Sequence, residues 1–158
     1  MKKIVAIALT LILVLSLAAC GGSESASSVK LDVAQVYEKL TQTATLPEML
    51  ELDESLMLDY CGIKAEDVKA AKVAICADSL RTDEIWVIDA KDAAAAKTIA
   101  DLAQKRLTKK GEESITYSPE QYAVVEKAEL IQTGNFLVLI VSPDVELLAA
   151  AVRQMAGI

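Results

Sequence analysis

Apolar residues recur at three- and four-residue intervals in several stretches of the chain, which is the spacing of one helix face. The first stretch runs from Asp32 to Ala44, and Asp32 can cap its first turn while Gln35 stands three residues on. Similar patterns predict four more helices: a short one after Pro47 that Gly62 ends, one from Asp92 to Lys109 that Gly111 ends, one over 120–127 that starts at Ser118-Pro119, and a last one with the stripe Val145, Leu148, Val152 and Met155.

Shorter apolar runs between these stretches predict four strands, over residues 70–77, 84–89, 128–133 and 136–141. The last two are separated by Gly134-Asn135, a pair typical of a two-residue hairpin turn. The runs over 85–88 and 136–141 are apolar at every position, so we expect central strands that are covered on both faces.

These elements predict an α+β fold with a four-stranded, mostly antiparallel sheet and two helices packed on one face. The stretches 84–103 and 135–154 have the same order of elements, which fits equally a β-β-α internal repeat and a common motif that simply occurs twice. The leading helices are expected to cover the second face. Otherwise that face is an apolar patch and a candidate partner surface.

The first thirty residues have the pattern of a leader and a tether. Met1-Lys2-Lys3 precedes a 14-residue apolar run, which is shorter than the roughly 20 residues of a membrane span. Leu17-Ala18-Ala19-Cys20 then ends the run, followed by a small, polar stretch to Val29. We predict a lipoprotein signal peptide over 1–19, a lipidated Cys20 with a flexible tether to residue 30, and a single domain over 31–158. The alternative is an ordinary secretory signal with a chance Cys20.

The net charge and the content of His and Cys limit the kinds of partner and of chemistry that we expect. The leader takes Lys2 and Lys3 from 16 basic residues and nothing from 23 acidic residues, so the mature chain has a net charge of −9. That charge argues against nucleic acid as a partner and against adsorption on anionic lipid. The chain has no His, which removes the commonest general base and metal ligand. Cys61 and Cys76 would be free to pair after export, but their spacing leaves a disulfide open.

No nucleophile, phosphate-loop or metal-binding motif is present, and we expect no cofactor and no metal. The acidic pairs Asp53/Glu54, Asp83/Glu84 and Glu112/Glu113 leave a carboxylate-based envelope hydrolase as the alternative to a non-catalytic binding or accessory module. For the module, the expected contact surface is the turn around 78–84, with Asp83 and Glu84 as solvated acids, and any uncovered sheet near Trp86. An envelope protein is the expected kind of partner.

The chain resembles the small lipoproteins of low-GC Gram-positive bacteria that carry domain of unknown function 4358. The resemblance rests on the leader through Cys20, on Leu52-Asp53, on Tyr60-Cys61-Gly62-Ile63, on Glu84-Ile85-Trp86-Val87 followed by Asp92, and on Gly134-Asn135 before the last apolar strand. The family has no established activity, so the resemblance implies no catalytic residue. It implies an exported α+β domain, anchored by lipid at the outer face of the cell membrane.

Overall fold

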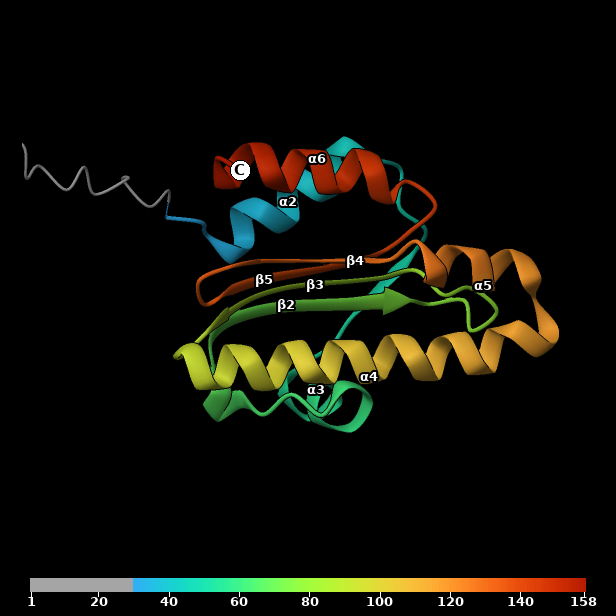
Figure 1. The fold of residues 1–158 in the computed structure, drawn as a ribbon, viewed down its shortest axis with the longest axis horizontal. Helices are drawn as coiled ribbons and strands as arrows, with labels where there is room; N and C mark the ends of the chain where they lie inside the picture. The colour runs from blue at the N-terminus through green and yellow to red at the C-terminus, as the bar shows by residue number, and fades with distance from the viewer. Residues whose placement is uncertain (1–29) are drawn as a thin grey trace, which may run out of the picture.

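The computed structural model describes residues 30–158, which form an antiparallel sheet between two layers of helices (Figure 1). Five strands pair in the order β1-β2-β3-β5-β4. In chain order the elements are α2 (Val33–Thr43), β1 (Met49–Glu51), α3 (Glu54–Cys61), a 3₁₀ turn (Ala65–Asp67), β2 (Val68–Cys76), β3 (Glu84–Ala90), α4 (Ala93–Tyr117), α5 (Pro119–Glu126), β4 (Glu129–Thr133), β5 (Phe136–Val141) and α6 (Val145–Ala156).

Alternating residues of β3 and β5 face two separate cores, because successive side chains of a strand point to opposite faces. Trp86 pairs with Leu139 in the sheet, and both face the core beneath α3 and α4. Ile85 pairs with Ile140 on the opposite face, beneath α2 and α6. The prediction of central strands covered on both faces is therefore confirmed.

The prediction that both helices lie on one face is wrong. Helices α4 and α3 cover one face of the sheet, and α2 and α6 cover the other (Figure 1). The cause lies in β3 and β5, since strands that are apolar on both sides need a cover on each. The orders β2-β3-α4 and β4-β5-α6 match the expected units, but a repeat stays a prediction.

The sheet has a fifth strand that the sequence did not predict. Met49, Leu50 and Glu51 pair with the end of β2, in a segment expected to be helical from Pro47 onward. Only the later part is helix: Asp53 caps α3 by accepting the Leu56 N–H at 2.9 Å. At the other end Gly62, with φ of 73°, terminates α3 as expected.

Helix α4 continues past Gly111, where the sequence predicted its end, to Tyr117. Gly111 is buried where α5 packs against α4, and a Cβ placed there would lie 3.6 Å from the Tyr122 ring. Glycine lowers helix stability by only about 1 kcal/mol, so the residues on either side of Gly111 keep α4 helical past this position. Ser118 then ends α4 and caps α5, accepting the Gln121 N–H, with Pro119 at the first helical position.

The hairpin between β4 and β5 forms as predicted. Thr133 pairs with Phe136, which leaves Gly134 and Asn135 as the two turn residues. Gly134 has φ of 59° while Asn135 does not have a positive φ, as in a type II′ turn. The predicted signal peptide, Cys20 and the tether lie outside the described residues. Within residues 30–158 the helices are too short or too polar to cross a bilayer.

Candidate binding cleft

A fully buried carboxylate lies at the start of β3. The side chain of Glu84 has no exposed surface, and three other side chains donate hydrogen bonds to it. One oxygen, Oε1, accepts the Trp86 indole N–H at 2.7 Å and Arg106 Nε at 3.0 Å. The other, Oε2, accepts Arg106 Nη2 at 3.0 Å and Lys110 Nζ at 2.8 Å. The burial of this charge is thus compensated by two cations.

Burial alone would raise the pKa of Glu84, because it removes water from the carboxylate. The positive charges of Lys110 and Arg106 and the hydrogen bonds from both outweigh that effect, so the pKa of Glu84 lies below its ordinary value. The same contacts hold the pKa of Arg106 above its ordinary value despite partial burial. Glu84 and Arg106 are therefore both ionised at neutral pH.

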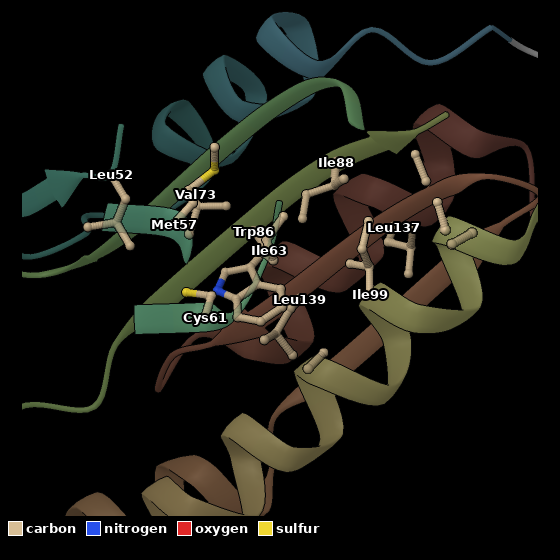
Figure 2. Close-up of a cluster of buried hydrophobic side chains, with 14 of the residues drawn as sticks. Leu52, Met57, Cys61, Ile63, Val73, Trp86, Ile88, Ile99, Leu137 and Leu139 are labelled. Atoms are coloured by element: carbon tan, nitrogen blue, oxygen red, sulfur yellow. The ribbon is translucent and has the colours of Figure 1, made fainter. Parts of the chain in front are cut away.

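The three residues singled out for the expected contact surface are buried, although residues 78–81 of the same turn are exposed. Asp83, Glu84 and Trp86 are all at least 98% buried, so the prediction that these acids are solvated is wrong. Asp83 is buried against Arg81, whose Nε lies 3.0 Å from Asp83 Oδ2. Trp86 lies in the core beside Cys61 and Leu139 (Figure 2). Both acids can be buried because each is paired with a cation: Asp83 with Arg81, and Glu84 with Arg106 and Lys110.

Hydrogen bonds also attach that turn to α4 and α5. The backbone N–H of Thr82 donates to the side-chain carbonyl of Gln121 at 2.8 Å. The Thr82 carbonyl accepts Lys110 Nζ at 3.0 Å, and the Tyr60 carbonyl accepts Arg106 Nη1 at 3.2 Å. Segments that are distant in sequence are thereby joined around Glu84.

A cleft of about 450 Å³ opens above this cluster, between α3, the β2–β3 turn and the second half of α4. Four cations line it: Arg106 and Lys110 on the floor, with side chains 16% and 12% exposed, and Arg81 and Lys109 near the mouth. Leu50, Tyr60 and Tyr117 also line the cleft and are each about half exposed. On a chain of net charge −7, the cleft is a locally positive and partly apolar surface.

A second hollow, of about 480 Å³, lies between α4 and α5. It is lined by apolar residues such as Leu107, Ile115 and Val125, and its charged lining residues are Glu112 and Glu126. No buried charge opens into it, so the cleft above Glu84 is the stronger candidate for a binding site.

The remaining predicted groups do not hydrogen-bond to Glu84, although Cys76 and Glu113 line the cleft. Asp53 is used as the cap of α3, and Glu112 and Glu113 are exposed on α4. In the part of the chain that the structure describes, no group of three acidic or Cys side chains is placed to hold a metal. Cys61 and Cys76 are buried as free thiols, and burial raises the pKa of Cys61 to about 12. The open alternative of a disulfide is not realised in this structure.

One feature of the sequence, two cations on the buried face of α4, indicates the Glu84 cluster. The buried positions of α4 run Ala96, Ile99, Ala103 and then Ser114, at helical spacing. Arg106 and Lys110 fall on the same face, at the intervening positions of that spacing. Two cations on a buried helical stripe indicate a buried acid opposite them, although not which one.

The profile of a family described as Domain of unknown function (DUF4358) matches residues 42–142, which is more than half of the chain. The chain belongs to the DUF4358 family. The DUF4358 match contains all five strands, Glu84 and both of its cations, whereas α6 and most of α2 lie outside it. No curated protein and no solved structure matches the chain. Membership of the DUF4358 family therefore adds no activity to what the cleft suggests.

Proposed function

We propose that this DUF4358 protein is a lipid-anchored, non-catalytic binding or accessory module at the outer face of the cell membrane, and that the cleft above Glu84 is its binding surface. The single observation that carries the proposal is the cleft floor, where two cations share one buried carboxylate. Such a floor carries a net positive charge, and exposed apolar side chains next to it are available for contact.

The anchor rests on the sequence. The basic start, the short apolar run and Leu17-Ala18-Ala19-Cys20 fit a lipoprotein signal, and two long acyl chains hold a protein on a membrane stably. We expect Cys20→Ser to abolish labelling by a radioactive fatty acid and to release the protein or leave it unprocessed. A variant that labels and partitions like the wild type would remove the anchor from the proposal.

The position of the cleft suits this anchor. The described chain begins at the start of α2, at one end of the sheet (Figure 1). The β2–β3 turn and the last turns of α4, which form the cleft, lie at the opposite end. A domain tethered through residues before α2 can therefore present the cleft to other components of the envelope.

The carboxylate chemistry argues against the hydrolase alternative. A carboxyl group that acts as a general acid must carry a proton near neutral pH, which requires a raised pKa. Glu84 has a lowered pKa and all of its surface covered by protein. Its role is to hold Arg106 and Lys110 at the floor of the cleft.

Photo-crosslinking in native membranes tests the proposed surface. A benzophenone amino acid replaces Tyr117 at the mouth of the cleft or, as the control, Leu147 on α6; the two positions are 57% and 54% exposed. We expect an adduct of defined mass from position 117 and none from position 147. Adducts from both positions or from neither would contradict the cleft as the binding surface.

A further inference from the structure

The donor groups on the cleft floor are only partly used within residues 30–158. A Lys ammonium has three N–H donors, and Lys110 gives one to Glu84 and one to the Thr82 carbonyl. A guanidinium has five, and Arg106 gives three, through Nε and Nη2 to Glu84 and through Nη1 to the Tyr60 carbonyl. One donor of Lys110 and two of Arg106 remain.

The floor also carries more positive charge than Glu84 neutralises. Glu84 contributes one negative charge against the two positive charges of Arg106 and Lys110. Arg81 and Lys109 at the mouth pair with Asp83 and Glu113, so they balance locally. The described cleft therefore has a net charge of about +1, at a place where the cations are more than four-fifths buried. Low solvent exposure strengthens the attraction of such a site for an anion.

Part of the cleft lining is apolar or aromatic. This part consists of Leu50, Tyr60, Ile75, Cys76 and Tyr117, beside polar residues such as Ser79 and Thr82. A cavity of this volume, with a charged floor and a partly apolar lining, can hold a small molecule. A fully solvated anion such as inorganic phosphate would leave the apolar part of the lining unused.

From these observations we infer that the cleft binds a small molecule that presents a carboxylate or a phosphate to Arg106 and Lys110 and packs an aromatic or apolar body against the apolar part of the lining, with Tyr60 and Tyr117. This inference rests on the proposed function, because it names the ligand class of the same cleft. Charge-assisted hydrogen bonds from the unused donors would hold the oxyanion, and the apolar body would supply the remaining burial.

The protein contains a built-in reporter for this site. Trp86 is the only Trp of the chain, and its indole N–H donates to the same Glu84 carboxylate that holds both cations. An oxyanion that draws Lys110 and Arg106 toward itself changes the hydrogen bond from Trp86. A single indole N–H signal in a ¹⁵N NMR spectrum therefore reports occupancy.

The test is a titration of the full-length, lipidated protein in neutral detergent with phenyl phosphate, benzoate, inorganic phosphate and, as the cationic control, benzylammonium. We expect saturable shifts of the indole signal with the first two, at least tenfold weaker binding of inorganic phosphate, and none with benzylammonium. Whichever of phenyl phosphate and benzoate binds more tightly identifies the oxyanion as phosphate or carboxylate.

Variants then locate the binding. Lys110→Gln should weaken phenyl phosphate by about tenfold or more, the loss of one charge-assisted hydrogen bond, while Lys97→Gln, on the exposed side of the same helix, should change it less than twofold. Tyr117→Ala, at an exposed position that leaves the fold intact, should weaken phenyl phosphate but not inorganic phosphate. Absent or non-saturable shifts, or equal losses in Lys110→Gln and Lys97→Gln, would overturn the inference. A protein adduct from position 117 with no anion binding would overturn the small-molecule inference alone and leave the proposed function standing.

Discussion

Replacing Glu84 by Gln should destabilise the domain strongly, because it leaves two cations at a buried position without their counter-charge. The amide keeps one acceptor oxygen for Trp86 and Arg106, but its NH₂ faces N–H donors of Arg106 and Lys110. Two charge-assisted hydrogen bonds are lost, at about 1.5–3 kcal/mol each, and removal of one partner from a buried ion pair costs about 3–5 kcal/mol.

The structure favours a loss at the lower end of the range of about 3–5 kcal/mol for a broken buried ion pair. Arg106 and Lys110 keep 16% and 12% of their side-chain surface exposed and retain the Tyr60 and Thr82 carbonyls as acceptors. We therefore expect a loss of about 3 kcal/mol in the free energy of unfolding, or about 10 °C in melting temperature for a domain of this size.

Urea unfolding followed by circular dichroism at pH 7 measures this loss. Glu113→Gln is the matched control: it removes the same charge from the same cleft, but the Glu113 side chain is 56% exposed and lies 3.8 Å from Lys109. Exposed pairs contribute less than about 1 kcal/mol, so the control should stay close to the wild type. The reasoning about the buried cluster would be refuted if Glu84→Gln also unfolded within about 0.5 kcal/mol of the wild type.

The difference in stability between the wild type and Glu84→Gln should depend on pH with a known sign. The pKa of Glu84 is lowered in the folded state from its ordinary value of 4.5. Its ionised form therefore stabilises the fold fully above about pH 4.5, and this contribution is lost as the pH falls through the lower, folded-state pKa. The difference in stability between wild type and Glu84→Gln should be constant near neutral pH and shrink below pH 4.5. A difference that grows on acidification would contradict the assignment.

Four further predictions concern local features. Gly111→Ala should raise the free energy of unfolding by about 0.5–1 kcal/mol, because Ala favours the helix and its methyl group would lie at an ordinary contact distance of 3.6 Å from the Tyr122 ring. Gly62→Ala should lower the free energy of unfolding by about 1–2 kcal/mol, because Gly62 has a φ of 73° and the new Cβ would lie 3.1 Å from Leu102. Thermal melts decide both, and a reversed order of the two would contradict the account. Gly134→Val should cost about 1–3 kcal/mol through backbone strain alone, because its Cβ position is open; an unchanged melting temperature would mean that the positive φ is unimportant. Cys61, with a pKa of about 12, should react with iodoacetamide at pH 8 about a thousandfold more slowly in the folded protein than in urea, as followed by mass spectrometry; equal rates would show that it is accessible.

Features set by adjacent residues were predictable from the sequence. The caps at Asp32 and Ser118 and the turn at Gly134-Asn135 depend on groups two or three residues apart, and each forms as expected. The two apolar strands were also identifiable, because a run without polar positions has no face to leave in water. Their burial in turn required helices on both faces.

The features that the sequence did not predict depend on contacts between distant segments. Met49 and Leu50 suit a helix or a strand equally, and β2 supplies the backbone partners that decide for a strand. Glu84 belongs to one of four pairs of adjacent acids along the chain, and adjacent acids usually lie in solvated turns. Its burial depends on Arg106 and Lys110, more than 20 residues away, which the packing of α4 against β3 brings next to it.

The most direct test of the cleft as the binding surface is lysine acetylation of intact cells compared with the purified protein. Lys97 and Lys109 lie on the same helix with side chains 78% and 69% exposed, but only Lys109 lines the cleft. The account predicts that both lysines label at similar rates in the purified protein and that Lys109 alone is protected on cells. Equal labelling of the two lysines on cells would contradict it.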